Sequence, residues 1–301
     1  MPHPFHVVDV FTDTALAGNP LAVVLDAGDI PDDRAQAIAR EFNLSETVFV
    51  ADPVDAINTA RLRIYTPARE LPFAGHPTVG TAALLAALRA PEMLARQDLA
   101  VVLEERIGPV ECIARRVKGR LQASFTLPKL PEGESSTVAA AIYATALGLD
   151  PSDIGYPGHA PSIFSAGVPY HCVPLAPGAI GRAAPQPSLW PGLLPADGPM
   201  SIFAYSRDVS DEGAAYRARM FSAGFGLGED PATGSAVAAF AGAIMACDPP
   251  GDGDHTIMVE QGYEMGRPSR IVLGLQVEGG ALASASIGGG VMRVSEGTLH
   301  L

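Results

Sequence analysis

The sequence predicts an α+β protein made of two pseudo-symmetric domains, each a barrel-like β-sheet wrapped round a central α-helix. Three observations lead to this fold class. The chain has 301 residues, enough for two cores. Strand-like runs far outnumber helix-like runs, whereas a doubly wound sheet would alternate the two. A stretch of the first half also recurs in the second half, which indicates a duplicated unit.

Short apolar runs rich in β-branched residues predict the strands. In chain order these runs are 5–11, 21–27, 46–52, 60–66, 99–105, 121–127, 171–176, 200–206, 218–224, 256–262 and 270–277. Helices are predicted over 31–42, 77–91, 135–148 and 232–247. The stretch 127–136 combines Pro, Gly and Ser and is interpreted as a linker, and 177–198 as a surface excursion with a short helix.

Composition and charge exclude several classes of protein. The chain carries 33 acidic and 20 basic residues, a formal charge of −13, which argues against nucleic acid and anionic membranes as partners. An anionic ligand would therefore need a local positive feature. Three scattered cysteines fit a reducing compartment. The N-terminal residues lack a basic region and are interrupted by Asp9, so we expect no signal peptide and a cytoplasmic protein.

The internal repeat aligns residues 63–85 with residues 219–239, with a gap of two residues. It places His76-Pro77 on Asp230-Pro231, Gly80 on Gly234 and Thr81 on Ser235. Residues 101–116 correspond loosely to residues 257–272. The shared order of strand, loop, proline, glycine, Ala-rich helix and strand pair predicts two halves of one fold.

The repeat also points to a site. Asp230 is a good helix N-cap, and Pro231 suits a first helical position. Two helix starts facing each other across a cleft would present free N–H groups, enough to bind a carboxylate without a lysine or arginine. His76 and Asp230 would stand at these starts as groups able to carry or position a proton. The alternatives are a plain helix cap for Asp230 and a turn residue for His76.

Other motifs are missing from the sequence. The glycines of 224–230 lack dinucleotide-binding spacing, and there is no phosphate-binding loop and no Gly-x-Ser-x-Gly elbow. The seven histidines show no His-x-x-x-His pair, so we expect no metal site. "IGGG" at 287–290 is interpreted as a structural turn or bulge.

The motifs together resemble a known family. They are "DVFTDTALAGNPLAVVLDA" (9–27), "FNLSETVFV" (42–50), "RIYTPARELPFAGHPTVGTAALLA" (63–86), "AGVPYHCVPL" (166–175), "GEDPATGSA" (228–236) and "IGGGVMRVSEGTLHL" (287–301). In this order they resemble the phenazine-biosynthesis PhzF-like isomerases, which share the diaminopimelate epimerase fold. The resemblance covers essentially the whole chain.

The resemblance implies domains over 1–128 and 129–291, with 292–301 returning to the first, and an active site between them. It implies a homodimer without metal, flavin, nicotinamide or pyridoxal cofactor. Carried over by motif, Glu46 in "SETVF" is the proton-shuttling acid/base, and His76 and Asp230 assist. The predicted substrate-binding residues are Gly75, Gly234, Ser235, Thr233 and Asn19. Related epimerases use two thiols, but Cys112, Cys172 and Cys247 lie outside both loops, which disfavours that mechanism.

We therefore expect a cofactor-independent isomerase that moves a proton on a small carboxylate, such as a cyclic or aromatic-like amino acid. The family's namesake acts on trans-2,3-dihydro-3-hydroxyanthranilate, and the motifs do not extend that substrate to this chain. Two other functions stay open. One is a non-catalytic metabolite-binding protein, and the other is a lyase or dehydratase on the same scaffold.

Overall fold

The computed structural model describes residues 2–223 and 228–301, which form two compact α+β units. Unit 1 is Met1–Thr126 with Gly288–Leu301, and unit 2 is Leu127–Ile287. The strand β17 (Ala281–His300) has residues in both units. None of the helices within the described ranges has the length and hydropathy needed to cross a membrane.

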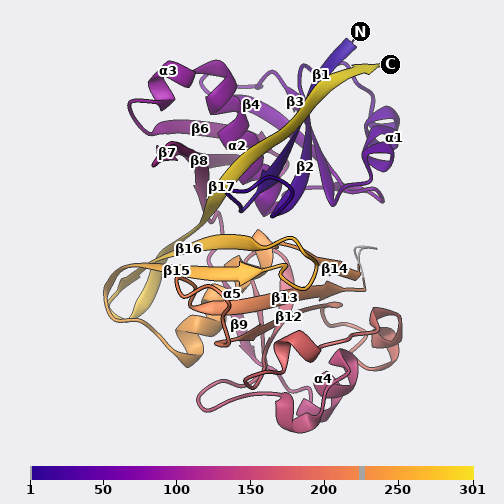
Figure 1. Ribbon diagram of the computed structural model, residues 1–301, viewed down its shortest axis with the longest axis vertical. Coiled ribbons are helices and arrows are strands. Elements are labelled where there is room, and N and C mark those ends of the chain that lie inside the picture. The colour runs from indigo at the N-terminus through magenta and orange to yellow at the C-terminus, as the bar shows by residue number, and fades with distance from the viewer. Residues whose placement is uncertain (1, 224–227) are drawn as a thin grey trace. The chain divides into compact units, whose positions relative to one another are not determined.

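Unit 1 contains a closed β-barrel (Figure 1). Pairing runs from β1 through β2, β3, β4, β6, β7, β8 and β17 and back to β1. The strands, besides β17, are β1 (Pro2–Val10), β2 (Asn19–Val24), β3 (Glu46–Ala51), β4 (Ala60–Tyr65), β6 (Leu99–Glu105), β7 (Gly108–Val117) and β8 (Arg120–Thr126), with the short β5 (Glu70–Leu71) beside β4. The parallel pairs β2–β3 and β4–β6 need crossover connections, which contain α1 and α2.

The helix α2 (Gly75–Arg89) lies inside this barrel (Figure 1), buried on every side from Gly75 to Ala86. Its mostly apolar sequence suits that position, since a helix apolar all round must be enclosed. Gly80 lets α2 approach the sheet, because a Cβ there would lie 2.7 Å from Val10 Cγ2. The amphipathic α1 (Asp32–Phe42) instead buries one face against β2, β3 and β4, and α3 (Pro91–Leu94) follows α2.

Unit 2 repeats this plan round α5 (Gly234–Cys247), which is buried along most of its length. Pairing runs β9, β10, β11, β12, β13, β15 and β16. These strands are β9 (Glu132–Ser135), β10 (Ser162–Ser165), β11 (Pro169–Pro174), β12 (Ser201–Ser206), β13 (Tyr216–Ser222), β15 (Gly253–Gln261) and β16 (Ser269–Glu278), with the short β14 (Gly228–Asp230) beside β13. Gly279 and Gly280, both at positive φ, form the turn from β16 into β17.

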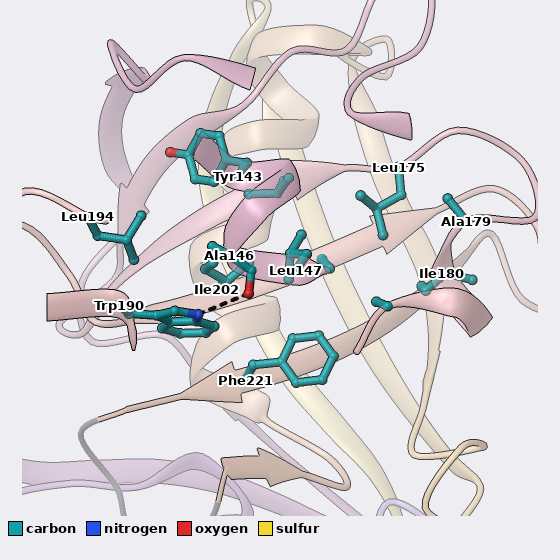
Figure 2. Close-up of a cluster of buried hydrophobic side chains, with 13 residues drawn as sticks. Tyr143, Ala146, Leu147, Leu175, Ala179, Ile180, Trp190, Leu194, Ile202 and Phe221 are labelled. Atoms are coloured by element: carbon teal, nitrogen blue, oxygen red, sulfur yellow. Dashed lines mark hydrogen bonds between the residues drawn. The ribbon is translucent and has the colours of Figure 1, made fainter. Parts of the chain in front are cut away.

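A hydrophobic core beside this sheet contains Trp190 (Figure 2). The core includes Tyr143 and Leu147 of α4 (Ala140–Leu147), and the Trp190 indole N–H donates to the carbonyl oxygen of Ala146 at 3.0 Å. Trp190 is fully buried in the short 3₁₀ helix Pro187–Gly192, and two more such helices lie at Pro151–Asp153 and Ile180–Arg182. The segment 177–198 contains short helices as predicted and is exposed over most of its length. It is more than a surface excursion, however, because it supplies the core with its largest side chain.

Two arginines at aligned positions make the same contacts in the two units. Arg63 on β4 and Arg219 on β13 each donate to two carbonyl oxygens three residues apart in a preceding segment. These carbonyls belong to Ala27 and Ile30 in unit 1 and to Ile180 and Ala183 in unit 2. The repeat seen in the sequence therefore extends to specific side-chain contacts.

Two glutamates show the same correspondence. Glu104 on β6 accepts from the backbone N–H groups of Val54 and Asp55. Its aligned counterpart Glu260 on β15 accepts from those of Ser210 and Asp211. Glu104 thereby holds the loop between β3 and β4, and Glu260 holds the corresponding loop between β12 and β13.

Some predicted elements need correction. The helix α5 begins at Gly234 with Thr233 as N-cap, so Asp230 is not the cap and Pro231 is not its first residue. Asp230 instead pairs with Met220 in the β13–β14 ladder, and that pairing excludes a helix there.

The predicted linker 127–136 contains β9, paired with β10. "IGGG" is not a turn but part of the strand β17, where a Cβ at Gly290 would lie 2.6 Å from the Thr12 carbonyl oxygen. The last residue of the predicted strand 218–224 lies outside the described residues.

Candidate active site

Glu46 and His76 come together in unit 1. The His76 Nε2 atom lies 3.3 Å from the Glu46 Oε2 atom, and the side chains are only 6% and 16% exposed. Glu46 begins β3 beside Leu21 of the parallel strand β2, and it shares the inward face of β3 with Val48 and Val50. His76 is the second residue of α2. A carboxylate and an imidazole are therefore held at one end of the barrel.

The first turn of α2 leaves its backbone donors available. The N-cap residue Ala74 has no side chain that could accept a hydrogen bond, so the N–H groups of Gly75 and His76 have no capping partner there. Pro77 is tolerated because it lies in the first turn, where a backbone N–H would have no carbonyl partner within the helix. The positive end of the helix dipole thus lies beside the Glu46–His76 pair.

Burial determines the charge of His76. Desolvation lowers the pKa of His76 to about 3, so the ring is neutral at physiological pH even with a carboxylate 3.3 Å away. A neutral imidazole donates from one ring nitrogen and accepts at the other. The Glu46–His76 contact therefore involves an uncharged ring rather than an imidazolium.

Asp230 and Thr233 form a second cluster, in unit 2. Thr233 Oγ1 donates to Asp230 Oδ2 at 2.5 Å, and Asp230 is 8% exposed. Gln261 at the end of β15 donates from Nε2 to the Asp230 carbonyl oxygen at 2.7 Å. Its Oε1 accepts from the Thr233 N–H at 3.2 Å. Gln261 thus fixes the segment that leads from β14 into α5.

The other predicted substrate-binding residues are placed as follows. Gly75 and Gly234 are buried first residues of α2 and α5. Ser235 follows Gly234, is partly exposed and has its Oγ 2.7 Å from the Tyr170 hydroxyl. Asn19 begins β2 with a fully buried side chain. Their assignment to substrate binding stays a prediction.

Two buried polar residues that contact the starts of the central helices, Gln261 and Glu105, were not predicted from the sequence. Gln261 ends an apolar strand and has no motif of its own. Glu105, the last residue of β6, is buried with its Oε1 atom 2.6 Å from the Thr78 Oγ1 atom in the first turns of α2. A signal for Glu105 exists, because strict alternation places it on the same face as Val101 and Leu103.

Each unit wraps a β-sheet round a buried helix, and unit 1 has a buried carboxylate–imidazole pair where that helix begins. The chain belongs to the phenazine biosynthesis-like protein family, whose model matches residues 8–297, and it is an isomerase of this family.

Its relatives extend over the full chain. An uncharacterized isomerase of Mesorhizobium japonicum is 48% identical, with 97% of each chain covered. A trans-2,3-dihydro-3-hydroxyanthranilate isomerase of Pseudomonas aeruginosa is 33% identical, with 99% of this chain and 100% of the relative covered. The crystal structure of a Bacillus anthracis phenazine biosynthesis protein of the PhzF family is 25% identical, with a TM-score of 0.89 and 100% of both chains covered.

Proposed function

We propose that the protein is a cofactor-independent isomerase in which Glu46 moves a proton on a small carboxylate, with His76 and Asp230 assisting. The buried Glu46–His76 pair is the observation that carries this proposal. A carboxylate is a competent general base, and a neutral imidazole beside it can donate a hydrogen bond or take up the proton in turn.

The proposed reaction conserves atoms and electrons. Glu46 as carboxylate takes a proton from a substrate C–H bond, and the electron pair of that bond moves into the adjoining π-system. The carboxylic acid formed then returns the proton to a different carbon or to nitrogen, which regenerates the carboxylate. The neutral ring of His76, 3.3 Å from Glu46, could donate a hydrogen bond to the carboxylate or accept one from the carboxylic acid.

The substrate's carboxylate is assigned to the helix starts. Free N–H groups at Gly75 and at Gly234 would bind an anion without a basic side chain, and both positions are buried. Asp230, which Thr233 and Gln261 hold in position, would accept from an amine or hydroxyl of the substrate. A ligand with both a carboxylate and an amine or hydroxyl, that is a small amino acid or hydroxy acid, would match these contacts.

A cyclic amino acid is the favoured substrate class. The Pseudomonas aeruginosa relative is named for isomerisation of trans-2,3-dihydro-3-hydroxyanthranilate, a cyclic amino acid whose conjugated ring can accept the electron pair. That compound is therefore the first candidate substrate for this chain, beside other cyclic and aromatic-like amino and hydroxy acids.

Proton NMR in D₂O tests the proposal. The wild type and Glu46→Gln would be incubated with a panel of such acids, including dihydrohydroxyanthranilate. The wild type should remove or shift one C–H signal of the substrate, and Glu46→Gln should slow this by roughly 10² to 10⁴, the usual contribution of a general acid/base. The matched control is Glu41→Gln on the exposed surface of α1, which should react like the wild type.

The other outcomes separate the alternative functions. A product of lower mass than the substrate would identify a lyase or dehydratase. Ligand-induced shifts of protein resonances without any change of the ligand, in both wild type and Glu46→Gln, would identify a binding protein. Equal turnover by wild type and Glu46→Gln would refute the role of Glu46.

A further inference from the structure

Glu105 is a buried acid that the proposed reaction does not use. It ends β6 on the inward face, and only 7% of its surface is exposed. Within the described part of the chain, its Oε2 atom is buried without a hydrogen-bond partner. An ionised carboxylate in that position would leave negative charge in the core, which is costly unless it is compensated.

A count of hydrogens at Thr78 indicates the protonation state of Glu105. The Thr78 Oγ1 atom lies 2.8 Å from the Ala74 carbonyl oxygen and 2.6 Å from the Glu105 Oε1 atom. A hydroxyl has one hydrogen, and the carbonyl can only accept. An ionised Glu105 would leave the Ala74 carbonyl and the carboxylate to share the one Thr78 hydrogen. Each contact is a full hydrogen bond if Thr78 donates to Ala74 and a protonated Glu105 donates to Thr78.

The second unit has an amide at the corresponding position. The alignment of 101–116 with 257–272 places Glu105 on Gln261, and both residues bind the start of the central helix of their unit. Gln261 is neutral and offers both a donor and an acceptor there. A protonated Glu105 offers the same pair of functions, whereas a carboxylate offers only acceptors.

The surroundings of Glu105 favour the neutral acid. Burial raises the pKa of Glu105 to about 8, and the contact with Thr78 lowers it by a smaller amount. The facing groups are Thr78 from α2 and the buried thiol of Cys112 from β7. Burial raises the pKa of the Cys112 thiol, and Glu105 raises it further by a smaller amount. Cys112 is therefore an uncharged neighbour of Glu105.

We propose that Glu105 is a positioning residue for His76, that its protonated carboxyl holds the first turns of α2 through Thr78, and that its ionisation at alkaline pH releases this contact. Thr78 lies two residues after His76, and its other partner, Ala74, is the N-cap of the same helix. Loss of the Glu105 donor would redirect the Thr78 hydroxyl from Ala74 to the carboxylate. The turn that carries His76 would then shift, and the Glu46–His76 contact with it.

The consequence for catalysis rests on the proposed function. The isomerase activity should fall on the alkaline side with a midpoint near pH 8, and Glu105→Gln should lack this decline because an amide does not ionise. The titration of the Glu105 carboxyl and the ring resonance of His76 can both be measured without any substrate. Failure of this proposal is thereby distinguishable from failure of the proposed function.

Carbon NMR of the side-chain carboxyls is the decisive experiment. In wild-type protein labelled with ¹³C at the glutamate δ-carbon, one carboxyl resonance should titrate with a midpoint near pH 8. This resonance should be missing from Glu105→Gln and present in Glu111→Gln, the control at an exposed acid of β7. If no glutamate carboxyl titrates between pH 7 and 9, the proposal is overturned, and this readout requires no variant to fold.

The ring resonances of His76 test the positioning role. In the wild type, the His76 Cε1–H signal should shift with the same midpoint near pH 8, although His76 itself does not titrate there. In Glu105→Gln this shift should be missing, while Glu111→Gln should keep it. A His76 signal that stays constant in the wild type from pH 7 to 9 would show that Glu105 is only structural.

Discussion

His76 combines burial with a titratable ring, and this gives the native state a defined acid sensitivity. Its pKa is about 3 in the folded chain and near 6.5 when unfolded, so the unfolded state binds a proton first as pH falls. The stability contributed by neutral His76 is complete above pH 6.5 and is lost between 6.5 and 3. Each pH unit in this window costs up to about 1.4 kcal/mol.

Urea unfolding at a series of pH values measures this effect, with His76→Gln as the comparison. The difference in free energy of unfolding between wild type and variant should shrink as pH falls below 6.5. His171, whose pKa burial lowers to about 4, adds acid sensitivity of the same sign to both proteins and so cancels in the difference. A difference that is constant from pH 7 to 4 would contradict the prediction.

The site residues were predictable from the sequence to different degrees. The repeat singled out His76 and Asp230, because it aligns them. Glu46 came only from the family resemblance, since one acid among 33 has no local mark. Glu105 and Gln261 were missed, because an acid or amide at the end of an apolar strand usually points to solvent. Their roles depend on contacts with residues more than 25 positions away along the chain.

At the scale of elements, the central helices depend on glycines at points of close approach. In α5, a Cβ at Gly242 would lie 2.3 Å from the Phe164 Cδ1 atom of β10. Overpacking of a core lowers the free energy of unfolding by about 1–3 kcal/mol. The higher helix propensity of Ala than of Gly raises it by about 1 kcal/mol. We therefore expect Gly242→Ala to destabilise unit 2 by a net amount of up to about 2 kcal/mol.

Denaturant unfolding followed by Trp190 fluorescence measures this loss, because the chain's one tryptophan lies in the core of unit 2. Gly251→Ala is the matched control, since no atom lies within 4 Å of the Cβ position there. Equal midpoints for the two variants would show that the cost of displacing Phe164 does not exceed the gain in helix propensity.

Element boundaries were predicted well where local chemistry decides them and poorly where pairing does. The helix predicted over 31–42 is observed at Asp32–Phe42, with acidic residues in its first turn and Asn43 at positive φ after its end. Asp230 and Thr233 are both residues that favour an N-cap, and sequence alone could not choose between them. The strand β9, "EGES", is exposed along its length, so no apolar alternation marked it.

At the scale of the whole molecule, the two units repeat one topology, and β17 belongs to both. This strand closes the barrel of unit 1 by pairing with β1 and β8. A chain that ends at residue 287 would leave both of these strands as open edges, which are exposed to solvent and prone to misassociation. Unit 2 would keep all of its own residues.

Hydrogen exchange tests this dependence. In the chain ending at residue 287, the amides of β1 and β8 should lose most of their protection, while those of β12 and β13 keep it. A synthetic peptide of residues 288–301 should restore protection to β1 and β8 when added in excess. Full protection of β1 in the shortened chain, without peptide, would refute the prediction.

The shared strand has a consequence for biosynthesis. A ribosome delivers the residues of unit 1 first, at about 5–20 residues per second, but the strand that completes its barrel comes last. Unit 2 is contiguous in the chain and can fold while translation continues. Residues 1–126 must therefore wait for residues 288–301 with two strand edges uncovered, so unit 1 matures after unit 2. Chaperone protection during that interval would act on the first 126 residues.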